Sequence, residues 1–189
     1  ENQNYVPINV TDVSDFVFSY INEEYFLFIV NVNNNKTVLS VYKISSFPSF
    51  TLANVINLNS QANENESFSE REINEFSGLL INNNNIYVSD QLNKGIHKFN
   101  FVKNLENYEF NNFSVYAAGS AYVDGRFNGV NFIKAVNNNQ LLVSDNGNNR
   151  IQNIINNTAD PIKVIASGTP TDIANPTAVI SDKHNNLYI

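Results

Sequence analysis

The stretch GLLINNNNIYVSDQLNKGIHKF, from Gly78 to Phe99, is matched further along the chain by FIKAVNNNQLLVSDNGNNRIQNI, from Phe132 to Ile154. Each contains a β-rich run, a turn of Asn residues, a second run that ends in Val-Ser-Asp, a polar turn, and a third run. The two Val-Ser-Asp triplets end at Asp90 and Asp145, so the repeat is 145 − 90 = 55 residues long. Repetition at this length is typical of proteins that stack copies of one supersecondary unit.

Further copies of the same pattern lie on both sides of these two stretches. We place the units at residues 12–58, 76–119, 132–168 and 176–189, with a polar insertion at 59–75 between the first two. Each full unit holds four short strand patterns, and helical periodicity is nearly absent. Four antiparallel strands per unit at this repeat length are typical of a propeller blade. We therefore predict an all-β fold, a single β-propeller domain over residues 1–189 with four-stranded antiparallel blades.

Asn makes up 38 of the 189 residues, and its runs mark the turns. They lie at 33–35, 82–85 and 137–139, in each case between two strand patterns. Asn tolerates the left-handed φ that tight hairpins need. We interpret these runs as hairpin turns inside the predicted blades.

Composition excludes several classes of partner. Eleven Lys and Arg against eighteen Asp and Glu give a net charge of −7, whereas binding to nucleic acid depends on clustered basic residues. The longest apolar run, Tyr25–Val30, is too short to cross a membrane as a helix. The chain has no Cys, which excludes disulfides, thiol catalysis and Cys-ligated zinc. We expect neither nucleic-acid binding nor membrane insertion.

A known family shares the pattern of the third unit. AAGSAYVDGRFNGVNF, from Ala117 to Phe132, together with the following LLVSDNGNNRIQNI, resembles an NHL repeat. The second unit departs from the pattern, because Lys94-Gly95 stands where Asn-Arg is expected. The resemblance implies a six-bladed propeller, and because the last unit stops at Ile189, it implies a fragment of such a ring, with further strands beyond that residue.

The residues at positions of the repeat pattern are the candidate site residues. They are Asp90, Gly119, Asp124, Gly125, Asp145, Gly147, Asn149, Arg150 and Gly168. We expect structural roles, in which Asp90 and Asp145 accept hydrogen bonds from backbone N–H groups of their own turns. Arg150 is expected to pair with a carboxylate or carbonyl of a neighbouring blade. The alternative use of the two carboxylates, for metal binding or acid–base chemistry, stays open.

Signals for metals and cofactors are weak. Residues 145–149, Asp-Asn-Gly-Asn-Asn, lack the alternating ligands of a calcium loop. His97 and His184, the two histidines, occupy unlike positions in different units, whereas zinc needs several converging ligands. We predict no cofactor and name no catalytic residue and no metal ligand.

The sequence favours a non-enzymatic binding or scaffold propeller whose loops contact a protein, a peptide or a glycan. The resemblance implies one alternative, a calcium-dependent, lactonase-like hydrolase on a six-bladed propeller, for which Glu23 or Glu24 could supply a carboxylate. Low charge, Asn, Ser and Thr richness and the missing initiator Met favour export to a cell surface or periplasm.

Overall fold

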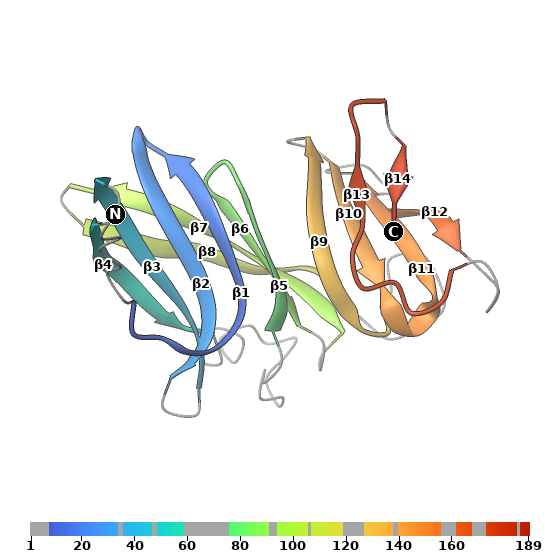
Figure 1. Cartoon of the computed structure of the whole chain (residues 1–189), viewed down its shortest axis with the longest axis horizontal. Coiled ribbons are helices and arrows are strands. Elements are labelled where there is room, and N and C mark those ends of the chain that lie inside the picture. Colours follow the sequence, from blue (N-terminus) through green and yellow to red (C-terminus); the bar gives the residue numbers. More distant parts are fainter. Residues whose placement is uncertain are drawn as a thin grey trace, which may run out of the picture.

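The computed structural model describes most of the chain as β-strands (Figure 1). The described residues are 8–33, 36–46, 49–58, 76–90, 94–105, 107–118, 127–137, 140–155, 162–167, 173–184 and 186–189. The all-β class and the four-stranded antiparallel sheets are confirmed, whereas the propeller remains a prediction. The polar insertion predicted at 59–75 lies outside the described residues.

Three four-stranded sheets follow one another along the chain, each in simple antiparallel order. The first sheet comprises β1 (Thr11–Ile21), β2 (Glu24–Asn33), β3 (Lys36–Ser46) and β4 (Ser49–Asn57). The second comprises β5 (Phe76–Asn82), β6 (Asn85–Asp90), β7 (Gly95–Asn104) and β8 (Asn107–Ala118). The third comprises β9 (Val130–Asn137), β10 (Gln140–Asp145), β11 (Arg150–Ile155) and β12 (Ile162–Ser167), with a 3-10 turn η2 (Asn146–Asn148) after β10. A two-stranded hairpin, β13 (Ile180–Ser181) and β14 (Leu187–Tyr188), ends the described chain.

Asn and a few other residues make the tight turns. Asn22 and Glu23, both with positive φ, join β1 to β2, as a mirror-image hairpin turn requires. Asn83 joins β5 to β6 with a φ of 54°. The interpretation of the run at 82–85 as a hairpin turn is therefore correct.

The sheets stack face against face, and the second strand of each is buried on both sides. Phe26 and Phe28 of β2 pack against Phe101 of β7, which joins the first and second sheets in one core. A second core, which includes Tyr87 and Val143, joins the second and third sheets. In β6 and β10 the last five residues are all buried, whichever face they point to. Burial of both faces explains why the apolar residues of these strands are consecutive and do not alternate with polar ones.

The first strands of successive sheets lie side by side, β1 next to β5 and β5 next to β9 (Figure 1). The Asp15 carboxylate of β1 accepts a hydrogen bond of 2.8 Å from the backbone N–H of Leu79 in β5. On the other side, a Cβ at Gly78 would lie 3.1 Å from the backbone O of Asn131 and 3.3 Å from the Cα of Phe132. Gly78 therefore allows β9 to approach β5 closely.

Candidate functional site: the buried carboxylates of the repeat

Asp145, the last residue of β10, is fully buried and accepts four hydrogen bonds. Its Oδ2 accepts from the Arg150 Nε at 2.7 Å and from the side-chain amides of Asn148 and Gln152 at 2.9 Å each. Its Oδ1 accepts from the backbone N–H of Asn128 at 2.7 Å. A buried charge is tolerated when it is paired and hydrogen-bonded, and Asp145 meets both conditions.

The turn after Asp145 brings these donors into place. Asn149 ends the 3-10 turn in the left-handed conformation, with a φ of 52°, and so starts β11 at Arg150. A Cβ on Gly147 would overlap the backbone O of Asn128, which excludes any larger residue there without a shift. Gly147 and Asn149 thus shape the turn between β10 and β11.

The same turn also contacts the segment that follows the third sheet. The Asn149 Oδ1 accepts a hydrogen bond from the backbone N–H of Asn175 at 2.8 Å. The Asn146 side-chain amide donates to the carbonyl of Pro176 at 3.5 Å. The turn therefore ties one repeat to the next.

The second sheet carries a variant of this site around Asp90, which ends β6 and is fully buried. Lys94 takes the left-handed place of Asn149, with a φ of 56°, and Gly95 stands where Arg150 stands in the third sheet. The His97 Nε2 lies 3.1 Å from the Asp90 Oδ2. His97 follows Asp90 by seven residues, as Gln152 follows Asp145, so the two sheets fill the same place with different donors.

One of our expectations about Asp145 needs correction. The backbone N–H that binds Asp145 belongs to Asn128, in the segment before β9, and not to the turn after Asp145. Arg150 binds the carboxylate of Asp145 within its own sheet, because residues 145 and 150 are direct partners across the β10–β11 hairpin. The partner in a neighbouring blade that we expected for Arg150 stays a prediction.

Glu24, offered as a carboxylate for the hydrolase alternative, is engaged in a cluster between the first two sheets. Its Oε1 lies 2.5 Å from the Nζ of Lys43 and 3.4 Å from that of Lys103, and its Oε2 accepts from the Tyr108 hydroxyl. The hydrogen bond from Lys43, followed by that from Tyr108, lowers the pKa of Glu24 from 4.5 to about 2. Glu23, the other candidate, is an exposed turn residue.

The structure does not describe four of the other candidate residues, and it places the two histidines in different environments. Gly119, Asp124, Gly125 and Gly168 lie outside the described residues. His97 is buried in the second sheet, whereas His184 is an exposed turn residue whose backbone N–H donates to Asp182. Within the described part of the chain, no group of three or more His, Cys, Asp or Glu side chains could hold a metal ion.

Sequence reasoning missed Asn128, Asn148 and Gln152 as ligands of Asp145. Asn148 and Gln152 carried a usable signal, because they lie three and seven residues after a buried carboxylate in a repeated hairpin. Asn128 carried none, since its backbone N–H contributes whatever its side chain is. Phe127, next to it, is fully buried in the core between the second and third sheets and anchors this segment.

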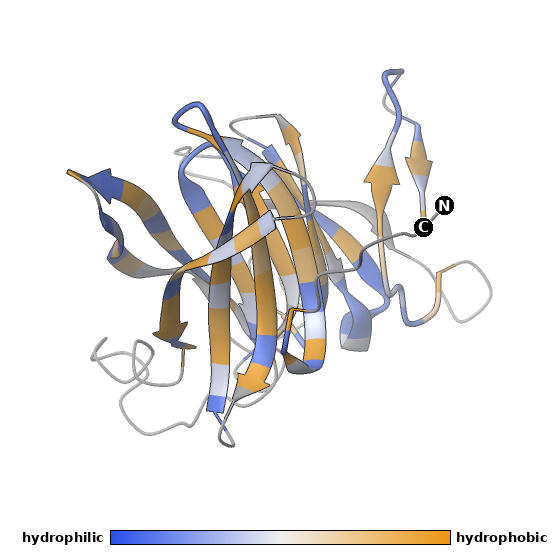
Figure 2. Cartoon of the chain, turned by 60° about the vertical axis from the view of Figure 1, so that its left-hand side comes forward, coloured by the Kyte–Doolittle hydropathy of each residue, from blue (hydrophilic) through white to orange (hydrophobic). Residues whose placement is uncertain are grey.

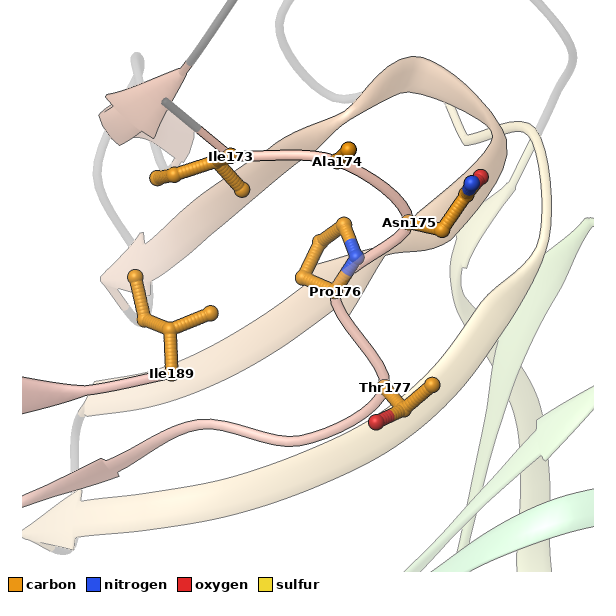
Figure 3. Close-up of a pocket in the computed structure, with 6 residues that line it drawn as sticks. All are labelled: Ile173, Ala174, Asn175, Pro176, Thr177 and Ile189. Carbon is orange, nitrogen blue, oxygen red and sulfur yellow. The ribbon is translucent and has the colours of Figure 1, made fainter. Parts of the chain in front are cut away.

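A hollow of about 290 Å³ lies near the C-terminal hairpin (Figure 3). The residues that line it are Ile173, Ala174, Asn175, Pro176, Thr177 and Ile189. They are uncharged and mostly apolar, and so provide contact surface rather than acid–base groups.

Comparison of the sequence with family models and with curated proteins finds no match. No helix in the described ranges is long and apolar enough to span a membrane.

Proposed function

We propose that the chain forms part of an NHL-like β-propeller and acts as a non-enzymatic binding scaffold. Three features support the propeller: sheets of four antiparallel strands, face-to-face stacking, and first strands that lie side by side. These are the relations between neighbouring blades in a ring. The resemblance of the third unit to an NHL repeat is the basis for six blades.

One observation supports the scaffold function most strongly: the carboxylates of Asp90 and Asp145 are buried and already hydrogen-bonded within the protein. Asp145 is fully buried and accepts four hydrogen bonds from its own sheet and the segment before it. Asp90 is fully buried as well and lies against His97. A carboxylate in this state holds a turn together and cannot reach a substrate, because a general base must lie within hydrogen-bond reach of the proton it takes.

The proposed partners are a protein, a peptide or a glycan, bound by the loops and outer surfaces of the sheets. In the hydrolase alternative, by contrast, carboxylates would have to be open to calcium. Glu24 is instead bound by two lysines and a tyrosine. The net charge of −7 supports a partner other than nucleic acid.

The test is thermal unfolding of the protein with added calcium and with a chelator, together with a screen of lactone and ester substrates. The scaffold proposal predicts the same midpoint in both conditions and no hydrolysis. Calcium bound only to the native state would raise the midpoint by about 5–10 °C at a hundredfold excess over its dissociation constant. Such a rise, accompanied by hydrolysis of a lactone, would overturn the proposal.

A further inference from the structure

The sequence contains two Asn-Gly pairs, Asn128-Gly129 and Asn146-Gly147. They are 146 − 128 = 18 positions apart, yet they lie against each other at the turn after β10. The backbone N–H of Asn146 donates to the Gly129 carbonyl at 2.9 Å, and the side-chain amide of Asn128 donates to the Gly147 carbonyl at 3.2 Å. Each Asn therefore binds the glycine of the other pair.

An Asn that precedes a Gly can react with its own backbone. The glycine nitrogen loses its proton and attacks the Asn Cγ, the Cγ–Nδ2 bond breaks, and the amide nitrogen leaves as ammonia. Water then opens the five-membered imide to give either Asp or isoaspartate, in which the chain runs through the side-chain carbonyl. Glycine favours ring closure because it has no Cβ to obstruct its nitrogen, and because both reacting groups belong to one molecule. The two pairs share this chemistry, so the fold decides between them.

The fold holds Asn128 in place. Its backbone N–H donates to the Asp145 carboxylate at 2.7 Å, and its side-chain amide donates to Gly147. A Cβ on Gly147 would lie 2.9 Å from the Asn128 Cγ, so the backbone of Gly147 already lies close to the carbon that would be attacked. Ring closure at Asn128 would have to break the side-chain hydrogen bond and displace Gly147.

The side chain of Asn146 is held more weakly. Its amide donates to the Pro176 carbonyl at 3.5 Å, longer than a usual N–H···O bond, and the glycine that follows it is exposed. The first N–H groups of a helical turn have no acceptor inside it, and the side chain of the N-cap Asp145 does not cap them in the described structure. The turn is also polar, and Figure 2 shows hydrophobic residues along the strands and mainly hydrophilic residues in several turns. Water can therefore reach the Gly147 nitrogen and take its proton.

We propose that Asn146 is a modification site, which converts to Asp and isoaspartate by spontaneous deamidation in the folded protein, and that Asn128 is protected. The reaction requires no enzyme and no co-reactant besides water. This inference goes beyond the binding function proposed above and does not depend on it.

Isoaspartate at position 146 would loosen the turn. It adds one methylene to the backbone between Asp145 and Gly147. Gly147 has little room to move, because even a Cβ would lie 2.0 Å from the Asn128 carbonyl oxygen. The guanidinium of Arg150, which follows the turn, would then shift relative to the Asp145 carboxylate that it binds. Modified molecules are therefore expected to be less stable.

Peptide mapping by mass spectrometry, after the protein has aged in a mildly alkaline buffer, tests the proposal. Trypsin separates the two sites, because Asn128 lies in the peptide Phe127–Lys134 and Asn146 lies in Ala135–Arg150. In the folded protein we expect Asn146 to deamidate at least about fivefold faster than Asn128, the factor that one further hydrogen bond to be broken contributes to a rate. In the protein unfolded in urea, where these contacts are lost, we expect the two rates to be similar.

Three results would overturn the proposal. They are a rate at Asn128 that equals or exceeds that at Asn146 in the folded protein, the same ratio of rates in the folded and the unfolded protein, and no reaction at Asn146 in the folded protein while the unfolded protein reacts fully.

Asn146→Gln is the control for the effect on stability, because the corresponding imide of Gln has six members and forms much more slowly. On ageing, the unchanged protein is expected to develop a second population with a lower unfolding midpoint, in proportion to the deamidated fraction. Asn146→Gln is expected to keep a single midpoint. A single, unshifted midpoint in extensively deamidated protein would contradict the loosening of the turn.

Discussion

At the scale of single residues, the second and third sheets bind an equivalent buried carboxylate with different side chains. Each places a fully buried Asp at the end of its second strand and a donor seven residues later, His97 for Asp90 and Gln152 for Asp145. The third sheet adds Arg150, where the second has glycine. The constant feature is therefore the carboxylate and its hairpin, which is what a structural role requires.

The ion pair between Asp145 and Arg150 should be essential to stability. Removing one member of a buried pair leaves an uncompensated charge, so Arg150→Met is expected to lower the free energy of unfolding by about 3–5 kcal/mol. Arg150 is 2% exposed and Asp145 is fully buried, so water cannot replace the lost partner. Urea unfolding at neutral pH measures the loss.

The double variant Asp145→Asn with Arg150→Met is the control. Because it removes both charges, it is expected to be more stable than Arg150→Met alone. If Arg150→Met unfolded at the urea concentration of the unchanged protein, the structural role of this pair would be wrong.

Glu24 should make stability depend on pH. Its pKa in the folded protein is about 2, below the value of 4.5 expected after unfolding. The charged form therefore stabilises the fold above about pH 4.5, and this contribution is lost as the pH falls toward 2. Glu24→Gln is expected to cost about 1–2 kcal/mol at pH 7, a figure reduced because the two lysines are partly exposed.

Urea unfolding of the unchanged protein and of Glu24→Gln at several pH values between 7 and 2 tests this prediction. The difference in their free energies of unfolding is expected to shrink as the pH falls toward 2. Glu23→Gln, at the exposed neighbouring position, is expected to change the unfolding free energy little at pH 7. A difference between Glu24→Gln and the unchanged protein that stayed constant down to pH 2 would contradict the account.

At the scale of elements, strands and turns could be predicted because their signals are local. The Asn run at 82–85 and the Val-Ser-Asp strand ends indicated a hairpin that the structure contains. The partners of Asp145 and Arg150 could not be fully predicted. Asn128 lies 17 residues before Asp145 and binds it through its backbone, so no side-chain pattern indicates the contact.

Gly78 is the element-scale position where close packing of strands can be tested. In an isolated strand, Gly→Ala usually stabilises, because the unfolded chain loses freedom. Here a new Cβ would lie 2.9 Å from the Ser89 Oγ and little more than 3 Å from the backbone of β9. Gly78→Ala is therefore expected to lower the free energy of unfolding by about 1–3 kcal/mol.

The Ser89→Ala variant distinguishes between the two groups that a Cβ at position 78 would contact, the Ser89 hydroxyl and the backbone of β9. It removes the hydroxyl but leaves the backbone of Asn131 and Phe132 in place, so the double variant should remain less stable than Ser89→Ala alone. If the double variant Gly78→Ala with Ser89→Ala were as stable as Ser89→Ala alone, β9 would not constrain β5. Thermal unfolding of the four proteins provides the comparison.

At the scale of the whole molecule, the central claim is that the sheets form one stack joined through their first strands. The sequence repeat predicted the sheets, but the relation between them depends on contacts such as Asp15 to Leu79, which join residues 64 positions apart. Such contacts leave no periodic signal. The propeller therefore remains a proposal that rests on this stacking and on the resemblance.

Hydrogen exchange at the Leu79 amide tests this claim most directly, because the acceptor of that amide is Asp15 in the neighbouring sheet. The account predicts slow exchange in the unchanged protein and exchange at least about tenfold faster in Asp15→Ala, equivalent to about 1.4 kcal/mol. The amides of β6 and β7 within the second sheet should keep their protection in that variant. Rapid exchange at Leu79 in the unchanged protein, while β6 and β7 stay protected, would show that the first two sheets are not joined through β1 and β5 and would contradict the stack.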